Sequence, residues 1–206
     1  MKSELNRRDR TRRAILDALA AVIAETGGLG FSVQQVAELA GVTHRTVYNH
    51  FPTRDALNDA LAEHVEDVMA RGGWRESPAT SSASLVAMIP DAYAAFQSYE
   101  MLSRAYVMLM LASRRPAGVA RRRTSAFEAV IARDTSPPPP LTSRGLTAAV
   151  RMFLSTTGWH ILTEQMGLSP AEAATTATWA AQTLLDAASP RTSAVARKTQ
   201  KRRGSR

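Results

Sequence analysis

Apolar residues recur every three or four positions from near the start of the chain. The members of the first stripe are Ile15, Leu16, Leu19, Val22 and Ile23. This spacing predicts an amphipathic helix over 7–26, and the glycines that follow at positions 27, 28 and 30 are expected to end it.

Three more helices are predicted before residue 72. Ser32 stands three residues before Gln35, a capping-box spacing that starts a short helix. The residues expected to face inward from this helix are Val33, Val36, Ala37 and Leu39. Thr43 can cap a second short helix that runs through Asn49. A longer helix begins near residue 53 or 54 and ends at about 71.

The helical spacing returns after a stretch at 72–84 that is rich in Gly, Ser, Thr and Pro and predicts a linker. The next broad stripe contains Leu85, Met88, Ile89, Ala92, Tyr93 and Phe96. Pro90 is expected to kink this helix or to occupy its first turn. Further helices are predicted at about 101–114, 117–133, 142–166 and 170–188, with a four-proline loop at 137–140. Because nothing shows the spacing of a strand, the predicted fold class is all-α.

Composition removes several kinds of chemistry. The chain of 206 residues has no cysteine, which excludes disulfides, thiolate nucleophiles and cysteine-ligated metals. Lysine occurs only at positions 2, 198 and 201, far from where a phosphate-loop or Schiff-base lysine would stand. The four histidines lack metal-ligand spacing, and no GxSxG, GxGxxG or HExxH motif occurs. We therefore expect no cofactor, no metal site and no enzymatic activity.

Positive charge is concentrated at the two ends of a chain whose net charge is +8. Residues 191–206 include seven basic and no acidic side chains, and residues 1–13 include six basic and two acidic ones. Either end could contact a polyanion or could simply be solvated. The longest apolar run, at 105–112, is too short to span a membrane, and no signal peptide is evident, so we expect a cytoplasmic protein.

The segment SVQQVAELAGVTHRTVYNHF at 32–51 has the pattern of two short helices that cross at a tight turn. Ala37 allows the helices to approach closely, and Gly41 can adopt a left-handed turn. Val42 and Val47 are expected to fill the small core between them. The second helix would expose Thr43, His44, Arg45, Thr46, Tyr48 and Asn49. Side chains of these types suit base edges and phosphates in a DNA major groove, so a helix-turn-helix is predicted.

On these residues the sequence resembles the tetracycline-repressor-like (TetR) family of bacterial regulators. The resemblance rests on FSVQQVAELAGVTHRTVYNHFPTRDAL at 31–57, with Tyr-x-His-Phe at the end of the second helix and a basic residue three positions beyond that Phe. About the first sixty residues match strongly, and the rest match in architecture. The resemblance implies a three-helix DNA-binding domain at 1–71 and a linker at 72–84. It also implies a helical effector-binding and dimerisation domain at 85–188. The residues themselves predict a basic, disordered tail at 189–206.

The resemblance also implies roles for individual residues. The expected base readers are Gln34, Thr43, His44 and Arg45. The residues expected to position phosphates are Thr46, Tyr48, His50 and Arg54, with Asn49 on the same surface. The chemistry agrees, because arginine can fork onto guanine and glutamine onto adenine. As alternatives, His50 could cap the end of its helix, Tyr48 could lie in the core, and Asn49 could be merely solvated.

The second domain concentrates methionine and aromatic side chains, which form either an adaptable pocket for an apolar or aromatic effector or an ordinary core. The candidate effector-binding residues are Tyr93, Phe96, Tyr106, Met110, Met152, Phe153, Trp159 and His160. The last helix is rich in small residues, including Ala173, Ala177 and Ala181, which would let it pack against a second copy of the chain or within its own.

Together these features predict a homodimeric transcriptional regulator, by default a repressor. It would bind a palindromic double-stranded DNA operator, dimerise through its last two helices and be released by a small-molecule effector. The alternative is a helical small-molecule-binding or interaction protein with only non-specific affinity for DNA through its basic ends.

Overall fold

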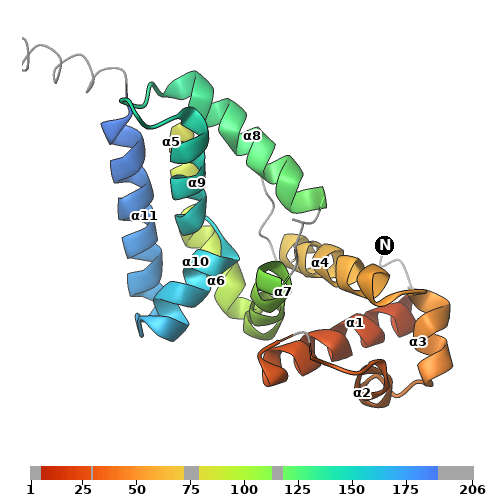
Figure 1. Cartoon of the computed structure of the whole chain (residues 1–206). Helices are drawn as coiled ribbons and strands as arrows, with labels where there is room; N and C mark the ends of the chain where they lie inside the picture. The colour runs from red at the N-terminus through yellow and green to blue at the C-terminus, as the bar shows by residue number, and fades with distance from the viewer. Residues whose placement is uncertain (1–5, 29, 72–78, 113–117, 190–206) are drawn as a thin grey trace, which may run out of the picture. The chain divides into compact units, whose positions relative to one another are not determined.

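The computed structural model describes residues 6–28, 30–71, 79–112 and 118–189. These ranges contain helices and their connections and no strand, which confirms the all-α fold class (Figure 1). None of the described helices combines the length and the hydropathy needed to cross a membrane. The described residues form two compact units, one from Met1–Arg75 with Phe96–Ala117 and the other from Glu76–Ala95 with Gly118–Arg206.

The first unit is built around helix α1 (Arg7–Thr26), which packs against α2 (Val33–Leu39), α4 (Arg54–Arg71) and α7 (Glu100–Ala112). Helix α3 (His44–His50) packs against α2. The predicted stripe of α1 is buried in full, and the helix ends at a left-handed glycine, Gly27, as expected. The predicted bounds of these first four helices are confirmed to within a residue or two.

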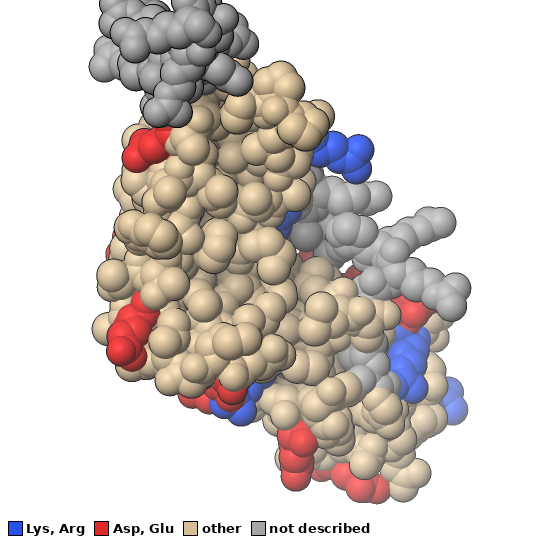
Figure 2. Space-filling view, turned by 60° about the vertical axis from the view of Figure 1, so that its left-hand side comes forward, with Lys and Arg blue, Asp and Glu red and all other residues tan. Residues whose placement is uncertain are grey.

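The second unit contains α5 (Ser82–Ala87), α6 (Ile89–Ser98, through Ala95), α8 (Gly118–Asp134), α9 (Ser143–Phe153), α10 (Thr156–His160), a π-helix η1 (Ile161–Gln165) and α11 (Pro170–Ala187). Helix α11 packs on α9 and α5, and α8 packs on the same two helices. Ser169 caps α11 and Pro170 occupies its first position, as predicted. Charged side chains are sparse on the face of this unit that carries α11 (Figure 2).

The predicted helix at 142–166 is wrong as a single element. Helix α9 ends at Phe153, Leu154 leaves the helical conformation, and the Ser155 hydroxyl accepts a hydrogen bond from the Gly158 amide to start α10. A π-helical turn then follows. A serine inside an apolar run has two readings, because its side chain can either point outward from a continuous helix or cap a new one.

The predicted linker at 72–84 is also longer than the structure allows. The Ser81 side chain accepts a hydrogen bond from the Ser84 amide, so that α5 begins at Ser82. Residues 72–78 of the linker, and the predicted tail beyond residue 189, lie outside the described residues. The stripe that follows is buried as predicted apart from half-buried Met88, where α5 and α6 meet, and Pro90 stands in the first turn of α6.

The predicted division into functional domains stays a prediction, and the compact units divide the chain differently. Helix α7, which the sequence assigned to the second domain, packs against α1 and α4 in the first unit. The Tyr106 hydroxyl of α7 donates to Glu66 Oε1 of α4 at 3.4 Å. Helices α1 and α4 are linked by His64 Nε2 and Asp17 Oδ1, which are 2.7 Å apart.

Gly158 is a position where any side chain should destabilise the second unit. A Cβ atom there would overlap the backbone carbonyl of Met152, and the Tyr93 hydroxyl would lie 3.4 Å away. We expect Gly158→Ala to lower the free energy of unfolding by about 1–3 kcal/mol, because backbone must move to relieve the overlap. Urea denaturation measures the difference. Gly30→Ala is the control, since a Cβ atom at Gly30 meets nothing within 4 Å. Equal effects of the two substitutions would contradict the packing described.

Candidate nucleic-acid interface

Local hydrogen bonds fix both the start of α2 and the turn between α2 and α3. The Ser32 hydroxyl accepts from the Gln35 amide and the Gln35 side chain accepts from the Ser32 amide, which completes the predicted capping box. Gly41 has a φ of 65°, the left-handed conformation expected for it. The Val42 amide then donates to the Ala37 carbonyl at 2.9 Å. The two helices therefore enter and leave the turn in a fixed geometry.

Thr43 starts α3 as predicted. Its hydroxyl accepts a hydrogen bond from the Thr46 amide at 3.1 Å and lies 2.8 Å from the Thr46 hydroxyl. On the inner side of α3, Val47 is buried together with Phe51 just beyond the helix. Val42, expected in this core, is only half-buried. The expectation for Leu39 is wrong, because it is 57% exposed at the end of α2.

The predicted DNA-contacting residues of α2 and α3 lie mostly on the surface. The exposed ones are Gln34, Thr43, His44, Arg45, Tyr48 and Asn49, and the half-buried ones are Thr46 and His50. Tyr48 is 43% exposed, so the alternative that it belongs to the core is wrong. Its ring meets the His44 ring edge-on at 4.8 Å between centroids. Gln34 donates from Nε2 to Glu38 Oε1 at 2.9 Å, so its amide is oriented along α2.

Two arginines near the turn are held on aromatic rings. The guanidinium of Arg54, in the first turn of α4, lies 4.0 Å from the centroid of the Phe31 ring. The guanidinium of Arg12, on α1, lies 5.0 Å from the centroid of the Phe51 ring. Both rings belong to buried residues, so each cation sits at the edge of the core of the first unit. Arg54 therefore has a defined position beside the start of α4.

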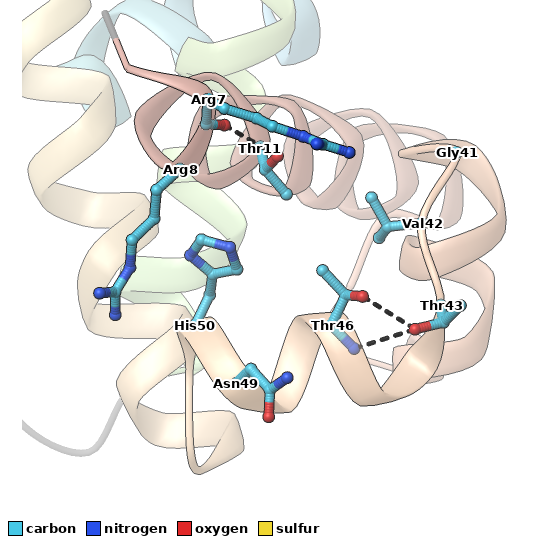
Figure 3. A pocket seen from close by; sticks show the side chains of 9 residues that line it. All are labelled: Arg7, Arg8, Thr11, Gly41, Val42, Thr43, Thr46, Asn49 and His50. Carbon is cyan, nitrogen blue, oxygen red and sulfur yellow. Dashed lines mark hydrogen bonds between the residues drawn. The ribbon is translucent and has the colours of Figure 1, made fainter.

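A cleft of about 900 Å³ lies between the start of α1 and the exposed side of α3 (Figure 3). Its lining residues are Arg7, Arg8, Thr11, Gly41, Val42, Thr43, Thr46, Asn49 and His50. The sequence did not place Arg7, Arg8 and Thr11 in the site. The basic N-terminal segment indicated that these arginines could contact a polyanion. It did not indicate that their side chains lie beside α3.

His50 lies at the C-terminal end of α3, beside this cleft. Burial, followed by repulsion from the guanidinium groups of Arg8 and Arg12, lowers the pKa of His50 below its ordinary value. The neutral imidazole is therefore favoured at neutral pH. The two guanidinium groups that act on this half-buried ring both come from α1.

The candidate effector residues are distributed over both units. Phe96, Tyr106 and Met110 belong to the first unit, and Tyr93, Met152, Phe153, Trp159 and His160 belong to the second. Three of those in the second unit are brought together, because the Tyr93 hydroxyl donates to the Phe153 carbonyl at 2.9 Å and Gly158 abuts Met152. Trp159 and Tyr93 are fully buried, whereas Met152 is 49% exposed. Burial also raises the pKa of Tyr93. Their role in effector binding stays a prediction.

The capped turn, the inward valine and the outward polar row define a helix-turn-helix protein. Residues 15–61 match the sequence model for bacterial regulatory proteins of the tetR family. The transcriptional repressor LfrR of Mycolicibacterium smegmatis is 43% identical over 77 residues, which are 36% of this chain and 39% of that protein. A transcriptional repressor of Mycobacterium tuberculosis is 33% identical over 72 residues, 35% of this chain and 38% of that protein. The chain thus aligns with well under half the length of each.

Solved structures match over most of the chain. TylP, a TetR regulator from Streptomyces fradiae, has a TM-score of 0.60 at 18% identity and covers 89% of both chains. NalD, the secondary repressor of the MexAB-OprM multidrug efflux pump in Pseudomonas aeruginosa, has a TM-score of 0.59 at 20% identity, over 88% of this chain and 98% of that one. These likenesses show a shared fold. Residues 15–61 thus resemble the TetR family of bacterial regulators, and the relatives matched over this part of the chain are named transcriptional repressors.

Removing the Thr43 hydroxyl should weaken the start of α3. We expect Thr43→Ala to lower the free energy of unfolding by about 1 kcal/mol, because the Thr46 amide loses its acceptor. Thr43→Ser keeps an acceptor oxygen and should restore most of the loss. Urea denaturation of the three proteins gives the comparison. Indistinguishable stabilities for the alanine and serine variants would contradict a capping role.

Proposed function

We propose that this chain is a transcriptional regulator that binds a palindromic DNA operator as a homodimer, with α3 in the major groove. The observation that carries the proposal is the outward row on α3, where Thr43, His44, Arg45 and Asn49 are exposed beside a cationic cleft. Repression is the proposed sense, since matched relatives are named transcriptional repressors. A cytoplasmic location goes with this function.

Arg45 is the proposed principal base reader. It is exposed in the first turn of α3, where a groove-lying helix brings its side chains to base edges. A guanidinium can donate two parallel hydrogen bonds to the O6 and N7 atoms of guanine. His44 and Gln34 are proposed to contact neighbouring bases. Thr46, Tyr48 and Arg54 are proposed to contact phosphates, which fix the register but carry no sequence information.

The outer face of α11 is the proposed centre of the dimer interface. Three of the small residues that the sequence suggested for a dimer interface, Ala173, Ala177 and Ala181, are fully buried within the chain. The face opposite them carries Trp179, which is 68% exposed, in a shallow groove of about 590 Å³ between α11 and Pro90 of α6. Charged side chains are sparse on this face (Figure 2). A large exposed aromatic ring on a weakly charged surface is typical of an interface centre.

Release by an apolar or aromatic small molecule completes the proposed cycle. An effector that binds one spacing of the two α3 helices better than the other lowers operator affinity by that difference in binding free energy. Two-fold symmetry would place the two α3 helices about one DNA turn apart, about 34–36 Å. The methionine and aromatic side chains around Tyr93 and Phe153 are the proposed support for such a site.

Selection from a pool of random duplexes tests the DNA-binding proposal. We expect the wild-type protein to recover a palindrome, and Arg45→Ala to bind that palindrome about 5- to 150-fold more weakly, the equivalent of about 1–3 kcal/mol. Selectivity should relax at one base pair of each half-site. Arg144→Ala, an exposed arginine on α9, is the matched control for the loss of one positive charge.

The same experiment separates the alternative function. A protein that binds DNA only through its basic ends would recover no preferred sequence, and its salt-sensitive binding would be the same with and without Arg45. That result would replace the regulator by a helical small-molecule-binding or interaction protein with non-specific DNA affinity.

Trp179→Glu should weaken the dimer about 30-fold or more, because loss of a central aromatic anchor costs about 2 kcal/mol or more. Sedimentation velocity over a range of protein concentrations measures the dissociation constant. Leu111→Glu is the matched control, since Leu111 on α7 is also apolar and also 68% exposed. A dimer that resists Trp179→Glu but not Leu111→Glu would move the interface away from α11.

A further inference from the structure

The cleft between α1 and α3 has the composition of an anion site. Arg7 and Arg8 reach it from the first turn of α1, and Asn49 and His50 reach it from the last turn of α3 (Figure 3). The guanidinium groups and a protonated imidazole only donate hydrogen bonds, and the Asn49 amide can donate through its nitrogen. Thr11 lines the cleft, but its hydroxyl donates to the Arg7 carbonyl within α1.

The carboxylates of the surrounding helices do not line this cleft. Asp9 of α1, Glu38 of α2 and Asp55 of α4 are absent from its lining. Glu38 accepts a hydrogen bond from Gln34. An anion that enters the cleft therefore meets cationic groups and, among the residues that the structure describes, no carboxylate in the lining.

The second cation that acts on His50 is Arg12. Arg12, one turn beyond Arg8 on α1, lies on the ring of Phe51, the residue that follows His50. Arg54 of α4 lies on the ring of Phe31. The other titratable groups of α3 are His44, Arg45 and Tyr48, and His44 stands at the opposite end of the helix against Tyr48. Protonation of His50 in the free protein would thus add a third positive charge beside Arg8 and Arg12.

We propose that this cleft is a phosphate site, in which Arg7, Arg8 and His50 hold one phosphodiester of the DNA backbone and His50 takes up a proton as the phosphate enters. The proposal rests on the proposed DNA-binding function and deepens it in two ways. It adds α1 to the DNA-contacting surface, and it makes the proton a second ligand that binds together with DNA.

The direction of the pH dependence follows from the charges. In the free protein, burial and the two arginines hold the pKa of His50 below its ordinary value. A phosphate offsets the arginine charges and accepts a hydrogen bond from the imidazolium, so it raises this pKa in the complex. Between the two pKa values the complex binds one more proton than the free protein. Affinity for DNA therefore rises as pH falls through that window, by at most about tenfold per pH unit and subunit.

Calorimetry of the full-length protein with a short duplex at low salt tests the site. Titrations in two buffers of different ionisation enthalpy give the number of protons taken up on binding. We expect the wild-type protein to take up a fraction of a proton per subunit near neutral pH, and His50→Gln to lose that fraction and to flatten the pH dependence of affinity. His64→Gln is the matched control, because His64 lies on α4 and is paired with Asp17.

Two further measurements address the arginines and the free site. Arg8→Gln should weaken duplex binding and reduce the slope of log affinity against log salt by about one unit. In proton NMR of the wild-type protein, the His50 C2 proton should titrate at a higher pH when inorganic phosphate is added. This second measurement does not depend on how well any variant folds.

The outcomes separate this inference from the proposed function. If wild-type protein and His50→Gln bind the duplex with equal proton uptake, the phosphate site at His50 is wrong and DNA binding stands. An His50 titration that inorganic phosphate leaves unchanged would also overturn the site. If the wild-type protein binds no duplex at low salt, the proposed function fails and the site fails with it.

Discussion

Burial of one face of α1 is the interaction on which the N-terminal unit depends. Ile15, Leu16 and Leu19 are completely removed from solvent where α2, α4 and α7 pack around this helix. Each such side chain contributes about 1.5–3 kcal/mol by leaving water. The packing also fixes where the polar first turns of α1 lie, so a hydrophobic contact positions Arg7 and Arg8 beside α3.

Local chemistry explains why so much of this unit is predictable from sequence. Ser32, Gly41 and Thr43 each act within three or four residues of their own position, as a cap, a left-handed turn and a second cap. Such signals do not depend on the rest of the fold. The positions of Arg7 and Arg8 do depend on it, because they face a helix more than thirty residues away in the sequence. The sequence therefore identified most of the α3 surface but not the helix that completes it.

In the C-terminal unit, the spacing of apolar residues predicts which side chains are buried but not which element covers them. Spacing correctly indicated that Ala173, Ala177 and Ala181 are covered, but it does not say by what, and in the structure α9 and α5 cover them. Trp179 lies on the opposite face and was not singled out, since one aromatic residue makes no pattern. The break at Leu154 was missed for a related reason. It depends on Ser155, whose hydroxyl caps a new helix at Gly158 although the same side chain could equally face outward from a continuous helix.

The surroundings of His50 disfavour its protonated form in the free protein. Arg8 and Arg12 repel an imidazolium at this position, and burial disfavours it further, so the free protein keeps His50 largely neutral at neutral pH. A histidine used only to cap α3 would gain nothing from arginines beside it. A phosphate between these groups converts the repulsion into attraction, because each cation then has an anionic neighbour. Arg8 and a protonated His50 are thus poorly matched to each other and well matched to a phosphate of the DNA backbone.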